Sequence, residues 1–227
     1  MNGCPVGINI PKFIKNIERG EFLEAAKTLK ATSALPAVCG RVCPQEKQCE
    51  SQCTHLKAGH EAVAIAIGTF CCWLRTWKRP NIRTGSSGKN NIKVAVIGSG
   101  PAGLSFAGDM AKQGYDVTVF EALHEIGGVL KYGIPEFRLP NKIVDVEIDN
   151  LSKMGVKFMK DCIVGKTISV ERLGSRRFQR YICSIRCRAP QLHEYPGWKF
   201  YQYHVFQRIS DPCKSNGMQP ARIRILL

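Results

Sequence analysis

The chain has 227 residues, 44% of them hydrophobic, and carries a formal net charge of +15. This length allows one or two globular domains, and the longest apolar run, residues 62–74, is too short to span a bilayer. The positive excess lies in residues 72–93 and 172–227, which show neither helical nor strand periodicity, so we expect neither nucleic acid nor a membrane as a partner. Eleven cysteines without an export signal predict a cytoplasmic protein whose reduced thiols bind metal.

Two helices are predicted at the start of the chain. Ile10, Phe13 and Ile17 recur at helical spacing, and Gly20 provides a stop. The apolar face of a second helix follows over residues 22–29. We therefore expect the N-terminal part to be helical.

Four cysteines follow close together: Cys39, Cys43, Cys49 and Cys53. Their spacing lets a loop and one helical turn bring several thiolates to one centre. Proline directly follows Cys43, as it follows Cys4, which is typical of iron–sulfur ligation, whereas zinc sites favour paired CxxC knuckles. An iron–sulfur cluster is the favoured interpretation, and a zinc site or buried cysteines without ligands stay open as alternatives.

A dinucleotide-binding unit is predicted from residue 94 onward. The apolar run over residues 94–97 is typical of a buried parallel strand, and the glycine loop of residues 98–103 follows it at once. We expect a helix over residues 104–113 and a second strand over 116–120, ending in Glu121, whose carboxylate can accept hydrogen bonds from a ribose. A third strand near Val156 would leave a short sheet with an open edge. The Gly127-Gly128 pair favours FAD over nicotinamide, with an ordinary turn as the alternative.

Four stretches of the sequence resemble the small chain of NADPH-dependent glutamate synthase. They are residues 3–11, 39–44, 94–104 and 127–140, and the similarity covers residues 3–68 and 90–171. The large subunit of NADH-dependent ferredoxin:NADP oxidoreductase and the N-terminal half of dihydropyrimidine dehydrogenase share these motifs. The resemblance implies a helical domain with two 4Fe–4S clusters, then an FAD domain, then an NADPH domain. Electrons would pass from NADPH through FAD and the clusters to a large subunit that makes glutamate.

The same resemblance implies site residues. Cys4, Cys43 and Cys49 match ligands of one cluster and Cys53 a ligand of the other, whereas Cys39 matches a position that the family does not require. The positions that match FAD contacts are Gly98, Ser99, Gly100, Pro101, Ala102, Gly103, Glu121, Gly128, Val129 and Arg138. No catalytic side chain is expected, because the isoalloxazine carries the hydride chemistry.

The sequence also departs from the family. The cysteine stretch that precedes the Cys4 position in the family is not found, so we expect three ligands of the Cys53 cluster to be missing. Cys71 stands where a Glu or Gln would complete the Cys4 cluster, and it could substitute for that ligand. After Glu171 the resemblance stops, and residues 172–227 hold 11 basic and two acidic residues without a second glycine fingerprint. We expect this tail to be an out-of-frame translation, which the coding DNA would test, with a novel basic tail as the alternative.

These observations predict the domain organisation. We expect an α-helical iron–sulfur domain over residues 1–75, a linker over 76–91, an incomplete α/β Rossmann-like FAD-binding domain over 92–171 and an irregular basic tail over 172–227. The expected function is electron transfer to a glutamate synthase large subunit or another electron-accepting subunit. Whether this chain is itself an active enzyme stays open, because no NADPH domain is recognisable. The alternatives are a ferredoxin:NADP transhydrogenase subunit, an inactive fragment and a metal-binding interaction module.

Overall fold

The structure is a computed structural model that describes residues 3–76, 90–169, 173, 178 and 180–183, without the side chains of residues 70, 72–76 and 180–183. The chain divides into two units, Met1–Ile185 and Arg186–Leu227, and every described residue lies in the first. The expected linker falls largely outside the described residues, as does most of the expected tail.

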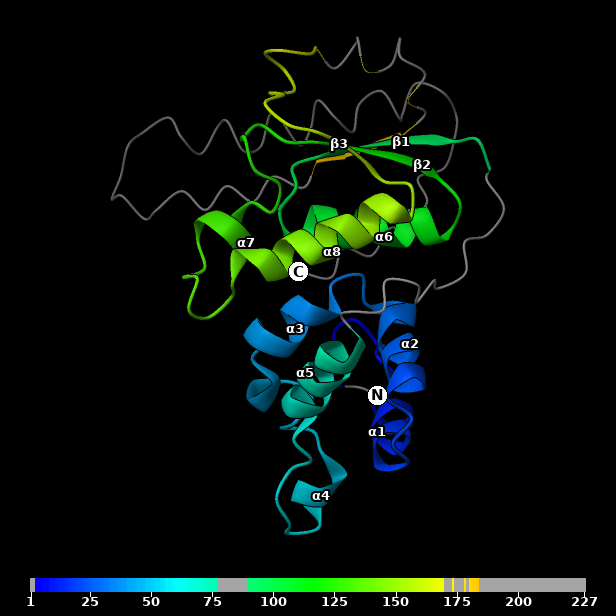
Figure 1. The fold of residues 1–227 in the computed structure, drawn as a ribbon, viewed down its shortest axis with the longest axis vertical. Coiled ribbons are helices and arrows are strands. Elements are labelled where there is room, and N and C mark those ends of the chain that lie inside the picture. Colours follow the sequence, from blue (N-terminus) through cyan, green and yellow to red (C-terminus); the bar gives the residue numbers. More distant parts are fainter. Residues whose placement is uncertain (1–2, 77–89, 170–172, 174–177, 179, 184–227) are drawn as a thin grey trace. The chain divides into compact units, whose positions relative to one another are not determined.

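The N-terminal part is helical, as predicted (Figure 1). Its elements are α1 (Ile10–Glu18), α2 (Phe22–Thr32), α3 (Pro36–Val42), the 3-10 turn η1 (Gln45–Lys47), α4 (Thr54–Lys57) and α5 (Ile65–Thr76). Asn9 caps α1, because its side chain accepts a hydrogen bond from the Lys12 backbone N–H at 3.2 Å. Gly20, at φ +76, makes the turn between α1 and α2.

Helices α1, α2 and α5 enclose a small apolar core. Phe13, Leu29 and Ile65 are buried together in it. Gly68 lets α5 approach α1 closely, since an added Cβ at this position would lie 3.1 Å from the Ile14 side chain. The same core also contains Cys49, so the cysteine-bearing loop is anchored to the helices.

The described part of the chain also contains one parallel sheet of four strands in the order β3-β2-β1-β4. The strands are β1 (Lys93–Ile97), β2 (Asp116–Phe120), β3 (Lys157–Met159) and β4 (Arg180–Cys183). The first three confirm the predicted strands. The fourth lies in the segment that we expected to be irregular, so that prediction is wrong for these residues. Parallel pairing of β4 with the distant β1 leaves no periodic signal in the local sequence.

Helices α6 (Pro101–Lys112) and α8 (Asn141–Lys153) cover one face of the sheet, and the short α7 (Val129–Tyr132) precedes α8 (Figure 1). Val94 and Val96 of β1 face these helices, whereas Ala95 and Ile97 belong to a separate buried cluster with Leu173. Helix α6 starts three residues before the predicted position, because proline is well suited to a first helical turn.

The helical part and the sheet share buried contacts. Leu35, Ala37 and Val38 lie in the same apolar cluster as Val144 and Leu151 of α8. The segment that carries α3 is therefore held against the sheet's helical layer. None of the described helices is long and apolar enough to cross a membrane.

Candidate cysteine and dinucleotide sites

Four of the cysteines singled out in the sequence lie near the end of α3. Cys43 follows α3, and its N–H donates to the Cys39 carbonyl one turn earlier at 3.2 Å, so both residues lie on one side of this helix. Cys4 packs against the core that contains Cys49. Gly3 lies against the same residue, because a Cβ on Gly3 would be 2.8 Å from the Cys49 Cα. The N-terminal segment thus brings Cys4 to the cysteine loop.

Neighbouring cysteines affect the pKa values of three of these thiols. Burial raises the pKa of Cys43 to about 11, and the charges of Cys39, Cys49 and Cys4 act in the same direction. Burial likewise raises the pKa of Cys39 and of Cys49, with Cys4 contributing to both. Burial thus opposes ionisation of the Cys39, Cys43 and Cys49 thiols, and ligation of a metal would release their protons.

Gln45 connects two of the cysteines. This buried side chain donates from Nε2 to the Cys39 carbonyl at 3.3 Å, while its own backbone carbonyl accepts from Cys49 Sγ at 4.0 Å. Cys43 Sγ donates to Gln48 Oε1 at 3.4 Å. The short turn between α3 and Cys49 is thus fixed by hydrogen bonds of its side chains.

Cys53 has a different environment. It precedes the first residue of α4, and hydrogen bonds from the backbone of Val63 and His55 lower the pKa of its thiol. The expectation that Cys53 serves another cluster than Cys43 stays a prediction. Cys71 lies on α5, and its role as a substitute ligand stays a prediction.

No group of three or more His, Cys, Asp or Glu side chains among the described residues is arranged to hold a single metal ion. The ligands of a 4Fe–4S cluster need not lie that close together, because each thiolate binds a different iron. The chemistry of the donor set, thiols in a partly apolar shell, suits such a cluster.

The predicted glycine loop joins β1 to α6. Gly98 adopts φ +97 and donates its N–H to the Phe120 carbonyl at 2.8 Å, which ties the loop to the end of β2. Pro101 and Ala102 form the first turn of α6, and Gly103 is buried within it. Gly100 precedes α6 at an ordinary φ of −63, yet a Cβ on it would meet no atom of the described part of the chain within 4 Å. The space beside Gly100 is therefore open, at the positive end of a helix dipole.

Gly128 packs directly onto this loop. Its φ is +53, and an added Cβ would lie 3.0 Å from the Gly100 Cα. The protein's own backbone therefore requires glycine at this position. The preference for FAD that the Gly127-Gly128 pair suggested stays a prediction.

Glu121 and Ser99 form the polar support of the loop. The Glu121 side chain is 6% exposed, and its Oε2 accepts from the Ser99 N–H at 2.8 Å and from the Ser99 hydroxyl. Its Oε1 accepts from the Leu123 N–H at 3.0 Å. A carboxylate oxygen can accept more than one hydrogen bond, so these contacts leave capacity for a ribose hydroxyl.

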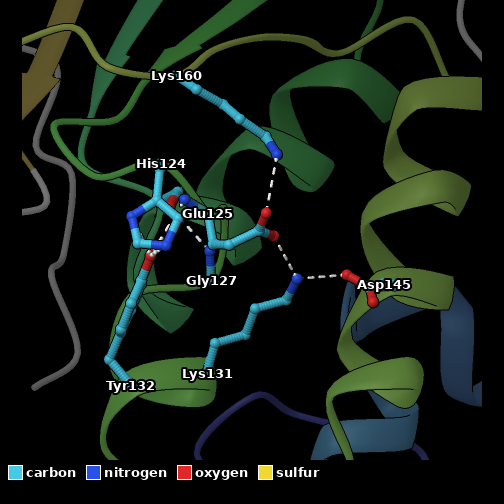
Figure 2. A network of polar contacts seen from close by, with 8 residues as sticks. His124, Glu125, Gly127, Lys131, Tyr132, Asp145 and Lys160 are labelled. Carbon is cyan, nitrogen blue, oxygen red and sulfur yellow. Dashed lines mark hydrogen bonds and ion pairs between the residues drawn. The ribbon is translucent and has the colours of Figure 1, made fainter.

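Ion pairs fix the segment that follows Glu121 (Figure 2). Lys131 of α7 reaches between Glu125 and Asp145 of α8, with N–O distances of 2.7 and 2.5 Å, and Lys160 pairs with Glu125 at 3.3 Å. Hydrogen bonds from Lys131 and then Lys160 hold the pKa of Glu125 below its usual value. The two glycines next to the loop are thus carried on a segment that is fastened to α8.

Tyr132 and His124 make further polar contacts within this segment (Figure 2). The Tyr132 hydroxyl accepts from the Glu125 N–H at 3.1 Å and lies 3.3 Å from the His124 ring nitrogens. Val129 and Arg138, two of the expected FAD contacts, have exposed side chains. Their role toward a flavin stays a prediction.

The sequence analysis missed Glu147, which the structure buries between the two parts of the chain. Buried positions of α8 recur at Ile143, Val144, Glu147 and Leu151, so the carboxylate occupies the apolar face of this helix. An acidic residue at helical spacing among apolar ones was the signal that could have revealed it.

Two family models match the chain. Residues 1–80 match the family described as dihydropyrimidine dehydrogenase domain II, 4Fe-4S cluster, and residues 96–155 match the NAD(P)-binding Rossmann-like domain. An iron–sulfur domain therefore precedes a Rossmann-like domain, as predicted, and iron–sulfur and flavin cofactors are supported for chains of this kind.

Several curated proteins are similar to this chain. The dihydropyrimidine dehydrogenase subunit PreT of Escherichia coli (strain K12) is 41% identical over 172 residues, which are 75% of this chain and 41% of that protein. The glutamate synthase [NADPH] small chain of Azospirillum brasilense is 35% identical over 174 residues, 75% of this chain and 36% of that protein. The histamine dehydrogenase structure from Rhizobium sp. 4-9 aligns at 18% identity over 79% of this chain and 24% of that chain, and its TM-score of 0.40 is too low to carry a conclusion.

The chain thus spans about two fifths of the length of these curated relatives. Its similarity to them covers the cysteine loop and the glycine loop together, which confirms the resemblance found in the sequence. The chain is homologous, over three quarters of its length, to the glutamate synthase small chains and to the PreT subunits of dihydropyrimidine dehydrogenase.

Proposed function

We propose that this chain is the cluster- and flavin-binding portion of an electron-transfer oxidoreductase subunit. The glutamate synthase small chain is the type of subunit that it resembles. Bound flavin would supply hydride chemistry with a nicotinamide, and a 4Fe–4S cluster would carry single electrons onward. The proposed compartment is the cytoplasm, where thiols stay reduced.

The open space beside Gly100 carries this proposal. The φ of Gly100 is accessible to any residue, and no neighbouring atom of the described residues excludes a side chain there. The protein itself therefore gives no reason for glycine. A pyrophosphate that approaches the backbone at the start of α6 does give one, because a side chain would occupy its place.

The proposed roles of the chain's residues follow from their positions. Backbone N–H groups at the start of α6 would hold the phosphates, and Glu121 would bind the ribose while Ser99 orients its carboxylate. Cys4, Cys43 and Cys49 would hold one cluster, with Cys53 serving another. No side chain of this chain needs to move a proton in this proposal.

The electron acceptor belongs to a partner subunit. A glutamate-forming large subunit is the first candidate, because the relatives include glutamate synthase small chains. A pyrimidine-reducing partner is the second candidate, because the chain is also 41% identical over 172 residues to the PreT subunit of dihydropyrimidine dehydrogenase. Copurification from the native host, followed by assays with 2-oxoglutarate and glutamine or with a pyrimidine, separates the two.

Electron transfer within the chain can be tested directly. The full chain is purified without oxygen, supplied with FAD, iron and sulfide, and given a one-electron pulse at the flavin. We expect the cluster absorbance to bleach in a first-order step whose rate does not depend on protein concentration. A chain that binds zinc but neither iron–sulfide nor flavin would contradict the proposal and support the metal-binding interaction module.

A further inference from the structure

Glu147 makes an unusual contact between two distant parts of the chain. Its side chain is 2% exposed, and its Oε1 accepts a hydrogen bond from the Ala37 N–H at 2.7 Å across 110 positions of sequence. Ala37 is the second residue of α3, so its N–H has no partner within that helix. Leu35, which precedes α3, provides no side-chain cap. The carboxylate on α8 takes the place of that cap.

The surroundings of Glu147 are positively charged. Burial raises the pKa of Glu147, while the Ala37 hydrogen bond and the charges of Lys30 and Arg41 oppose that change. Burial lowers the pKa of Lys30, with Glu147 acting in the opposite direction and Lys112 in the same one. Arg41 also donates to the Ala37 carbonyl at 3.1 Å. A carboxylate from the sheet part thus faces two cations of the helical part, Lys30 and Arg41.

The helix that Glu147 caps carries the cysteines. Cys39 lies on α3 and Cys43 follows its last residue. The negative charge of Glu147 is one of the influences that raise the pKa of Cys39, so its field reaches this thiol, one turn before Cys43. A displacement of α3 would move Cys43 relative to Cys4 and Cys49.

Apolar packing between α3 and α8 does not by itself require a carboxylate at position 147. Leu35, Ala37 and Val38 already pack against Val144 and Leu151 in one apolar cluster. Burying a charge is costly, and an apolar residue of similar volume would join the same surfaces. The hydrogen bond and the charge are what Glu147 adds to the contact.

We propose that Glu147 is a positioning residue for the cluster held by Cys43. It anchors α3 to the sheet part of the chain and places a negative charge near Cys39, on the helix that leads to Cys43. Reduction of the cluster adds one electron and thus one negative charge, so a nearby carboxylate makes reduction less favourable. This inference rests on the proposed function, since it requires that the cysteines hold a cluster.

The test compares the full-length wild-type chain with the variants Glu147→Gln, Glu147→Ala and Asp149→Asn, all purified without oxygen. Glutamine keeps the size and the acceptor oxygen of Glu147 but removes its charge. Asp149→Asn is the matched control, because it removes one charge from an exposed position on the same helix. Iron, sulfide and the midpoint potential of the cluster are measured for each protein.

We expect Glu147→Gln to keep the wild-type iron and sulfide content and to shift the cluster potential to a more positive value, with little shift in Asp149→Asn. Glu147→Ala should lose iron and sulfide, and the amides of α3 should exchange hydrogen faster. A Glu147→Gln potential equal to that of Asp149→Asn overturns the electrostatic role, even if Glu147→Ala fails to fold. Unchanged exchange of the α3 amides in Glu147→Ala overturns the anchoring role. A wild-type chain without iron or sulfide defeats the proposed function instead, and amide exchange still decides whether Glu147 anchors α3.

Discussion

At the scale of single residues, two glycines of the dinucleotide site have different roles. Gly128 has a positive φ and lies against the Gly100 backbone, so the fold itself needs it. Gly100 has an ordinary φ and open space beside it, so only a ligand would need it. The sequence motif alone does not separate these roles, because both residues read simply as glycine.

Alanine substitutions separate the two roles. Gly128→Ala should lower the free energy of unfolding by about 1–3 kcal/mol, because it combines a disfavoured φ with a close backbone contact. Gly100→Ala should leave the unfolding midpoint unchanged or slightly raised and weaken FAD binding by about tenfold or more. Urea unfolding and a flavin titration measure the two effects.

Gly20→Ala is the control for the effect of φ, since Gly20 has φ +76 but nothing within 4 Å of an added Cβ. It should cost less stability than Gly128→Ala and leave FAD binding unaltered. If Gly100→Ala binds FAD as tightly as the wild-type chain, the space beside Gly100 is not a phosphate site.

At the scale of elements, the sequence predicted those helices and strands that depend on the local pattern of apolar residues. The apolar spacing predicted α1 and α2, and short apolar runs predicted β1 and β2. The strand β4 was not predicted, because it is defined by its pairing with β1 about ninety residues earlier. The burial of Glu147 could have been inferred from its spacing on α8, but its partner Ala37, 110 positions away, could not.

The candidate site likewise has features that the sequence predicts and features that depend on tertiary packing. The glycine loop, Glu121 and the cysteines could be found from residue type and spacing. The Ser99 bond to Glu121 could not, because it depends on the pairing of β1 with β2. The Lys131 ion pairs could not either, because they depend on how α7 packs against α8.

The Lys131 ion pairs predict an effect of pH on stability. Lys131 holds the pKa of Glu125 below its usual value of 4.5 in the folded state. A carboxylate with a lowered folded-state pKa stabilises the fold above its unfolded pKa, and this contribution is lost as the pH falls through the folded-state pKa. The variant Lys131→Met should therefore lose less unfolding free energy than the wild-type chain between about pH 5 and about pH 3.

Denaturant unfolding at a series of pH values measures this slope. Lys15→Met is the control, because Lys15 pairs with Glu18 on the exposed surface of α1. It should leave the acid-side slope as it is in the wild-type chain. Equal slopes for Lys131→Met and Lys15→Met would show that the pairs of Lys131 do not stabilise the segment after Glu121.

At the scale of the whole molecule, two redox motifs lie in one compact unit. The cysteine loop and the glycine loop belong to parts that share a buried apolar cluster and the Glu147 hydrogen bond. A shared core favours a fixed separation between cofactors held by the two parts. This arrangement supports the central claim that the chain binds a cluster and a flavin together.

The visible absorption spectrum of the full chain, purified without oxygen, tests that claim most directly when iron, sulfide and flavin are assayed on the same sample. The account predicts a flavin band on a broad iron–sulfur absorbance, with iron, sulfide and flavin all present. A colourless protein with none of the three would contradict it, and would mean that the motifs record ancestry without cofactor binding in this chain.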